Sequence, residues 1–83
     1  MHVKILGPGC KNCQNLETRA REALDHLGLQ ADVEKVTDVA AIAGYGVMKT
    51  PGLDVDEKVL VSGRVPSADE VTGLLAAASG SQQ

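Results

Sequence analysis

The chain of 83 residues is long enough for one domain with a modest core, and its composition of 43% hydrophobic and 23% charged residues is that of a globular protein. Its net charge of −3 without a Lys/Arg cluster argues against nucleic acid as a partner, and no apolar run reaches the roughly 20 residues that span a bilayer. Residues 1–6 lack the pattern of a signal peptide, so we expect a cytoplasmic protein, in which an isolated disulfide is rarely structural.

The N-terminal third of the chain predicts a strand followed by a helix. Polar and apolar residues alternate over 2–6, which indicates a strand, and the Gly-Pro-Gly of residues 7–9 ends it. From Cys10 onward the apolar residues recur at spacings of three and four, as on one face of a helix, and Gly28 is expected to end that helix. The residues of the apolar face are Cys13, Leu16, Ala20, Ala23, Leu24 and Leu27.

The middle of the chain predicts a strand, a short helix and a β-hairpin. Residues 31–36 have the pattern of a strand, and Thr37 is expected to cap a helix that runs to about Ala43. Apolar alternation resumes over 53–55, and a turn then leads into a strand over 58–62. We therefore expect a β-hairpin that follows the short helix in the sequence.

The last element is a helix. Ser67 and Glu70 have the spacing of a capping box, and apolar residues follow it at helical spacing at Val71, Leu74, Leu75 and Ala78. We expect the domain to span residues 1–78 and residues 79–83 to form a flexible tail. The element order is β-α-β-α-β-β-α, and its first βαβ unit favours a parallel pair of strands.

Cys10 and Cys13 are the only cysteines, and they fall at the junction between the first strand and the first helix. A disulfide between them would close a loop of four residues and stabilise the fold by only about 2 kcal/mol in the loop-closure model. It would also join residues that one helical turn already holds together. A purely structural role is therefore disfavoured.

A metal site at this pair would need further ligands, because structural zinc in proteins takes four. His2 begins the first strand, about 15 Å from Cys10, and His26 lies about 20 Å along the helix from Cys13. A closed zinc site within one chain is therefore disfavoured. Two-coordinate Cu(I), or a metal shared between two chains, stays open as an alternative.

A redox role has the clearest mechanism. Cys10 is expected at the first turn of the helix, where unpaired backbone N–H groups and the helix dipole stabilise a thiolate, and Lys11 adds a positive charge. The pKa of the Cys10 thiol should therefore fall within about 3.5–7.5. Burial on the apolar face disfavours a thiolate at Cys13. Cys10 is thus the candidate attacking thiol and Cys13 the candidate resolving thiol.

The sequence resembles the thioredoxin superfamily, and within it the small thioredoxin-like redox-active disulfide proteins. Three stretches carry the resemblance, which covers residues 2–78: Gly7-Pro8-Gly9-Cys10-Lys11-Asn12-Cys13 at the Cys-x-x-Cys motif, Pro51-Gly52-Leu53 before the hairpin, and Gly63-Arg64-Val65 before the last helix. The resemblance implies an α/β thioredoxin-like fold, with a four-stranded mixed sheet and helices on both faces.

The resemblance also implies a thiol–disulfide oxidoreductase that uses no bound cofactor. The Cys10–Cys13 dithiol would exchange with disulfides of partner proteins and would be restored by a thioredoxin-reductase-like or thiol electron donor. Pro51 would follow a cis peptide bond that faces the disulfide, and the backbone of Thr50 would pair with an extended substrate segment. The further supporting residues implied by the motif are Gly9, Lys11 and Asn12.

The chain departs from ordinary thioredoxins and glutaredoxins in ways that bear on mechanism. Gly9, rather than an aromatic residue, precedes the first cysteine, and the first strand contains no acidic residue that could act as a buried proton shuttle. The tyrosine-containing motif and the Gly-Gly-x-Asp signature of glutaredoxins are missing. Glutathione use is therefore not implied.

Two other functions stay open at this point. One is a module that binds or transfers Cu(I) or another soft metal, and the other is a redox-sensing domain whose disulfide switches a partner interface. Heavy-metal-associated domains also place Cys-x-x-Cys between a strand and a helix, but in the order β-α-β-β-α-β. The capping box at Ser67 instead predicts a final helix after a hairpin.

Several polar residues outside the cysteine pair are expected to have ordinary structural roles. We expect His2 and His26 in solvent and Tyr45 either in the core or at the rim of the disulfide cleft. We expect Asp54, together with the acidic residues 56–57, at the polar tip of the hairpin.

Overall fold

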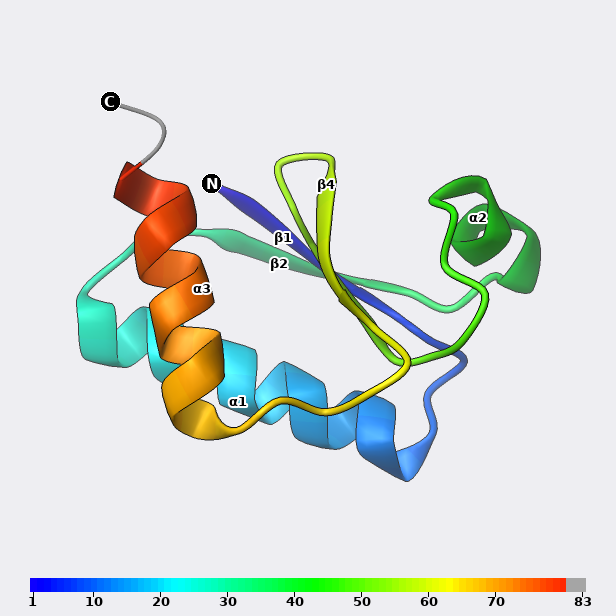
Figure 1. The fold of residues 1–83 in the computed structure, drawn as a ribbon, viewed down its shortest axis with the longest axis horizontal. Coiled ribbons are helices and arrows are strands. Elements are labelled where there is room, and N and C mark those ends of the chain that lie inside the picture. The colour runs from blue at the N-terminus through cyan, green and yellow to red at the C-terminus, as the bar shows by residue number, and fades with distance from the viewer. Residues whose placement is uncertain (81–83) are drawn as a thin grey trace.

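The computed structural model describes residues 1–80, and its elements follow the expected order (Figure 1). Helix α3 extends two residues past the domain end expected at residue 78, and residues 81–83 of the expected tail lie outside the described residues. The strands are β1 (His2–Leu6), β2 (Asp32–Val36), β3 (Gly52–Val55) and β4 (Lys58–Ser62), and the helices are α1 (Lys11–Leu27), α2 (Val39–Gly44) and α3 (Ala68–Gly80).

The four strands form one mixed sheet in the order β2-β1-β3-β4. β1 is parallel to β2 and antiparallel to β3, and β3 and β4 form the antiparallel hairpin. Leu6, the last residue of β1, pairs with Val36 on one side and with Gly52 on the other. The loop that follows β1 and the loop that precedes β3 therefore meet at the same edge of the sheet.

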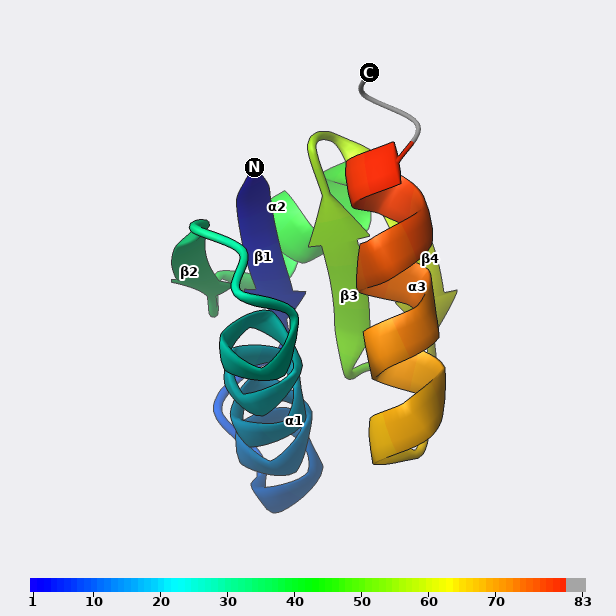
Figure 2. The ribbon, with the colours of Figure 1, turned by 90° about the vertical axis from the view of Figure 1, so that its left-hand side faces the viewer.

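Helices cover both faces of the sheet, as predicted. Figure 2 shows α1 and α3 in front of the sheet and α2 behind it. The alternation in β1 divides the core between the two faces, because Val3 and Ile5 pack against α1 and α3 whereas Leu6 packs on the side of α2. The core on the α2 side is small and consists of Leu6, Val36, Ile42 and Val47.

Helix α1 has the boundaries that its sequence predicts. Its buried residues are those of the predicted apolar face except Leu27, which is half-buried: Cys13, Leu16, Ala20, Ala23 and Leu24. Gly28 ends the helix with a left-handed backbone (φ 68°), and its N–H donates to the carbonyl of Asp25 at 3.1 Å. Helix α1 therefore begins and ends at defined residues, and the two cysteines lie at its N-terminus.

The caps of the other two helices differ from the prediction in detail. The expectation that Thr37 caps α2 is wrong: the helix begins one residue later, and the Asp38 carboxylate accepts a hydrogen bond from the Ala41 N–H at 3.3 Å. At α3 the Ser67 hydroxyl oxygen accepts from the Glu70 N–H at 3.2 Å, as predicted. The Glu70 carboxylate binds Arg64, and this hydrogen bond lowers the pKa of Glu70.

Asp54 does not lie at the hairpin tip, so that expectation is wrong. Both turn residues, Asp56 and Glu57, have positive φ (50° and 69°), as in a two-residue hairpin turn. Asp54 is fully buried in β3 between two neighbouring strands, directly opposite Lys4. Within residues 1–80, no hydrogen bond of ordinary geometry reaches either carboxylate oxygen, and burial raises the pKa of Asp54.

Lys4 is the centre of a polar cluster on the α2 side of the sheet. Its ammonium binds Glu57 Oε1 at 2.6 Å and the hydroxyl of Tyr45, and it lies 4.9 Å from the centroid of the Tyr45 ring. These hydrogen bonds raise the pKa of Lys4. Tyr45 also packs against the α2-side core, which is one of its two expected places. Among residues 1–80 no helix has the length and apolar character that crossing a membrane requires.

Candidate redox site

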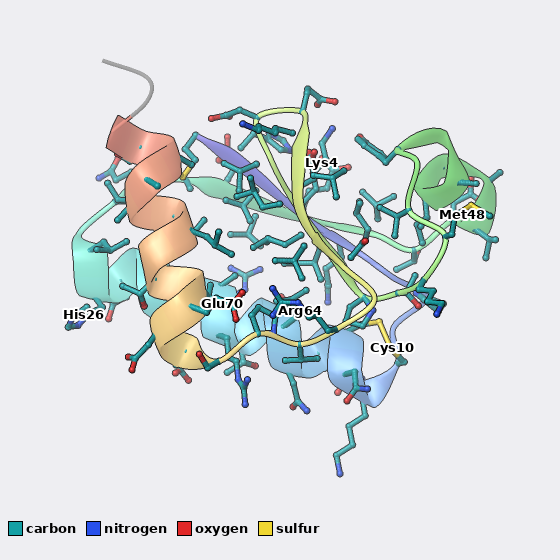
Figure 3. All side chains as sticks on the ribbon, viewed as in Figure 1. Lys4, Cys10, His26, Met48, Arg64 and Glu70 are labelled. Carbon is teal, nitrogen blue, oxygen red and sulfur yellow. A yellow bond between two sulfur atoms is a disulfide. The ribbon has the colours of Figure 1, made fainter. Side chains whose placement is uncertain are left out.

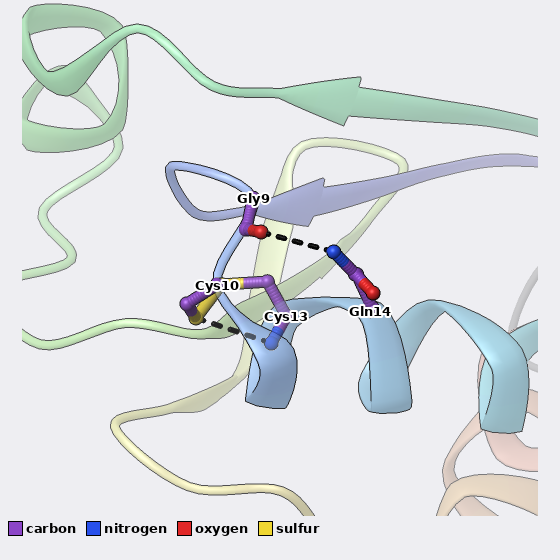
Figure 4. The surroundings of a disulfide bond; sticks show 4 residues. All are labelled: Gly9, Cys10, Cys13 and Gln14. Carbon is purple, nitrogen blue, oxygen red and sulfur yellow. Dashed lines mark hydrogen bonds between the residues drawn. A yellow bond between two sulfur atoms is a disulfide. The ribbon is translucent and has the colours of Figure 1, made fainter.

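Cys10 and Cys13 form a disulfide at the N-terminus of α1, with their Cα atoms 5.0 Å apart (Figure 4). Cys10 precedes the first helical residue and has an extended backbone, as an N-cap residue does. Its side chain is exposed, whereas Cys13 is only 4% exposed. Cys10 is therefore open to solvent and Cys13 is enclosed, which is the asymmetry that the sequence predicts.

The Cys10 sulfur itself caps the helix. It accepts a hydrogen bond from the Cys13 N–H at 3.2 Å, where an N-cap Ser or Asp would place its oxygen. The Gln14 side-chain amide donates to the carbonyl of Gly9 at 3.2 Å and holds the loop against the first turn (Figure 4). A sulfur in this position would be stabilised as a thiolate by the backbone amide and by the helix dipole.

Gly7 brings the end of β1 into direct contact with the buried sulfur. Its N–H donates to the carbonyl of Val36 at 2.9 Å, so the parallel ladder continues one residue beyond β1. A Cβ atom at Gly7 would overlap the Cys13 sulfur. Sequence reasoning used Gly7 only as a strand breaker and a motif residue. The signal that could have revealed its role is a buried cysteine side chain that must fit against the end of the preceding strand.

Thr50 and Pro51 reach the same edge of the sheet from β3. The peptide bond between them is cis, as the resemblance implies. Pro51 is fully buried and Thr50 is exposed. The Cβ of Thr50 would lie 3.7 Å from a Cβ atom at Gly7, and that same atom would lie 3.3 Å from the Cβ of Cys13. Thr50 and Cys13 therefore both approach the main chain at Gly7.

The remaining predicted residues lie next to Cys10 along the chain. Gly9 has a positive φ of 93°, which favours glycine, and it shapes the turn before Cys10. Lys11 and Asn12 are exposed in the first turn of α1. The structure thus brings together at one end of the molecule all seven residues predicted for the site: Gly9, Cys10, Lys11, Asn12, Cys13, Thr50 and Pro51.

A shallow apolar groove adjoins this end of the molecule. Its volume is about 340 Å³, and its lining includes Pro8, Val39, Met48 and Thr50. Met48 is 89% exposed and Val39 is 70% exposed, unusually high values for apolar side chains. Figure 3 shows Met48 and Cys10 at the same end of the molecule, far from His26.

The histidines do not join the cysteines. His2 begins β1, at the end of the strand opposite the cysteine loop, and its Nε2 lies 3.0 Å from Glu34 Oε1, so it is partnered rather than simply solvated. His26 is exposed in the last turn of α1, as expected (Figure 3). Within the described residues, no group of three or more His, Cys, Asp or Glu side chains is arranged to hold a metal ion.

Comparison with known proteins places these features in a family. Residues 1–76 match a protein family described as a thioredoxin domain. The chain is 43% identical over 75 residues to a thioredoxin of Methanothermobacter thermautotrophicus, an alignment that covers 90% of this chain and 97% of that protein. It is also 36% identical over 69 residues to a thioredoxin of Methanocaldococcus jannaschii, covering 83% of this chain and 79% of that protein.

Proposed function

The chain belongs to the thioredoxin domain family and acts as a thiol–disulfide oxidoreductase, and we propose that its Cys10–Cys13 pair exchanges with disulfides of partner proteins. Cys10 is the attacking thiol and Cys13 the resolving thiol. The observation that carries this assignment is the difference between the two sulfurs. The exposed one caps the helix and accepts a backbone hydrogen bond, and the enclosed one does not face solvent.

The first step is the attack of Cys10 on the partner disulfide. The backbone amide of Cys13 and the helix dipole stabilise the Cys10 thiolate, so its pKa lies below the usual value of about 8.5. The thiolate forms a bond to one partner sulfur, and the other partner sulfur leaves as a thiolate. The product is a mixed disulfide between Cys10 and the partner.

The second step releases the partner. Cys13 attacks the sulfur of Cys10, the mixed disulfide breaks, and the partner departs in its reduced form. The enclosed position of Cys13 supports this order, because a large partner has far better access to Cys10. An external reductant, either a thioredoxin-reductase-like protein or a thiol, then restores the dithiol in the cytoplasm.

The substrate is held by the loop that approaches the disulfide from β3. We propose that an extended partner segment pairs with the exposed backbone at Thr50, while the cis-Pro51 beside it supports that segment. Gly9, Lys11 and Asn12, which are exposed beside Cys10, complete the proposed binding site. The apolar groove beside Thr50 offers Met48 and Val39 for contact with apolar side chains of the partner.

A disulfide-reduction assay tests the proposal. With a protein disulfide as substrate and dithiothreitol as electron donor, we expect the wild-type chain to catalyse reduction and Cys10→Ser to abolish catalysis. A matched control is Ser62→Ala, which removes an exposed hydroxyl at the end of β4 and should leave the rate unchanged. Full activity of Cys10→Ser would contradict the assignment. Tight Cu(I) binding by an inactive wild-type chain would instead favour a metal-binding module.

A further inference from the structure

A small cleft lies behind the disulfide, between α1 and β2. Its volume is about 110 Å³, and its lining includes Cys13, Gln14, Glu17, Lys35 and Thr37. Glu17 follows Cys13 by four residues in α1, so the two side chains lie on the same side of the helix. A cleft of this volume with several polar groups in its walls can hold water molecules.

Two cations hold the Glu17 carboxylate. Arg21 Nε lies 2.9 Å from Oε2, and Lys35 Nζ on β2 lies 3.7 Å from Oε1. The Glu17 side chain is only 17% exposed, although both cations are more than half exposed. The titratable groups that line the cleft are Cys13, Glu17 and Lys35. The Glu17 carboxylate is therefore held one helical turn from the enclosed sulfur.

The resolving step needs such a group. Cys13 attacks as a thiolate, so its thiol must first lose a proton, yet it is only 4% exposed to solvent. β1 contains no acidic residue. The buried Asp54 lies beside Lys4 on the α2 side of the sheet, whereas its neighbours Leu53 and Val55 belong to the core under α1 and α3. Glu17 is the acidic residue that shares a cleft with Cys13.

We propose that Glu17, held by Lys35 and Arg21, accepts the proton of Cys13 through water in this cleft during the resolving step. The inference rests on the proposed roles of Cys10 and Cys13. It assigns a proton acceptor from α1 in place of the acidic residue that the first strand lacks.

The step balances in protons and electrons. At its start, Cys10 is joined to the partner by a disulfide, and Cys13 is a thiol. The Cys13 proton passes through water to the Glu17 carboxylate, and the Cys13 sulfur forms a bond to the Cys10 sulfur. The bond between Cys10 and the partner breaks, and its electron pair leaves on the partner sulfur as a thiolate. In this step the Cys13 sulfur is oxidised and the partner sulfur is reduced, whereas the Cys10 sulfur exchanges one disulfide bond for another, and Glu17 then returns its proton to solvent.

A two-phase reaction separates the steps. The reduced chain is mixed with an aromatic disulfide that releases a coloured thiolate, first when Cys10 attacks and again when Cys13 resolves the adduct. We expect Glu17→Gln to leave the first phase nearly unchanged and to slow the second by about tenfold or more near neutral pH. The deficit should shrink as the pH rises, because the Cys13 thiol then ionises without a proton acceptor.

Two controls make the result specific. Glu22→Gln neutralises an exposed carboxylate elsewhere on α1 and should leave both phases unchanged. Glu17→Asp retains a carboxylate and should recover part of the second-phase rate. A second phase of Glu17→Gln with wild-type rate and pH dependence overturns the inference, and so does an equal slowing of both phases. If the wild type itself shows no second phase, the proposed roles of the cysteines fail, and this inference fails with them.

Discussion

The sulfur of Cys13 lies against the main chain of Gly7, so closely that a Cβ atom on Gly7 would overlap it. The contact joins the end of β1 to the first turn of α1, and the Cβ of Thr50 would lie 3.7 Å from that same Cβ position. The Cys13 sulfur can occupy this enclosed position only because Gly7 has no side chain. The two strand ends and the helix start meet around this one contact.

Gly7→Ala should destabilise the protein, because the added methyl group must displace either the Cys13 sulfur or the strand. Overpacking of this kind costs about 1–3 kcal/mol in the free energy of unfolding. Chemical denaturation of the oxidised chain measures the loss. The matched control is Gly73→Ala, at an exposed position in α3 where a Cβ atom meets nothing within 4 Å. That control should stabilise the helix by about 0.5–1 kcal/mol. Equal stability of Gly7→Ala and wild type would contradict the close contact.

Lys11→Gln should raise the pKa of the Cys10 thiol only slightly, since Lys11 is exposed and its charge is strongly screened. The rate of Cys10 alkylation as a function of pH measures this pKa in the reduced chain. The difference from wild type should vanish in about 1 M salt, where the Debye length is roughly 3 Å. Lys58→Gln, in β4, is the control and should have no effect. If the pKa of the Cys10 thiol still differs between Lys11→Gln and wild type at high salt, the charge of Lys11 is not the cause of the difference.

Asp54→Asn should stabilise the protein at neutral pH, because it removes a charge that is buried without a hydrogen bond from the part of the chain that the structure describes. Burial raises the pKa of Asp54 above the ordinary 3.8, so the folded state binds this proton more tightly than the unfolded state. The penalty is therefore absent below pH 3.8 and grows as the pH rises through the folded-state pKa.

The gain from Asp54→Asn should be about 1–3 kcal/mol at pH 7 and should disappear toward pH 3.8. Urea denaturation at a series of pH values measures it. Asp25→Asn, at an exposed position of α1, is the control and should show little dependence on pH. A gain of the same size at every pH would mean that the Asp54 charge is not the cause.

The features that the sequence predicted correctly depend on neighbours along the chain. The span of α1 follows from apolar spacing and from Gly28, and the position of Cys10 at its start follows from the break at residues 7–9. The hairpin and the start of α3 were likewise readable from local patterns. Local periodicity thus located both cysteines on the fold and predicted which of them is exposed.

The features that were missed depend on contacts between distant segments. Asp54 is buried because β1 and β4 flank it, and this depends on a pairing register that alternation alone does not set. The close approach of Gly7 depends on how α1 packs against the end of β1. The position of Glu17 depends on β2, which places Lys35 3.7 Å from its carboxylate, and no local pattern distinguishes Glu17 from the other polar residues of α1. Thr37 and Asp38 are both good N-caps, so the sequence did not distinguish them.

The most direct test of the account is to trap the mixed disulfide and locate it. Reduced Cys13→Ser is incubated with a protein disulfide substrate, and peptide mass spectrometry then identifies the cysteine that carries the adduct. Without its resolving thiol, this variant should accumulate a stable adduct on Cys10, whereas Cys10→Ser should accumulate little under the same conditions. Failure of Cys13→Ser to form an adduct on Cys10, or equally rapid formation of an adduct on Cys13 in Cys10→Ser, would contradict the assignment of the two sulfurs.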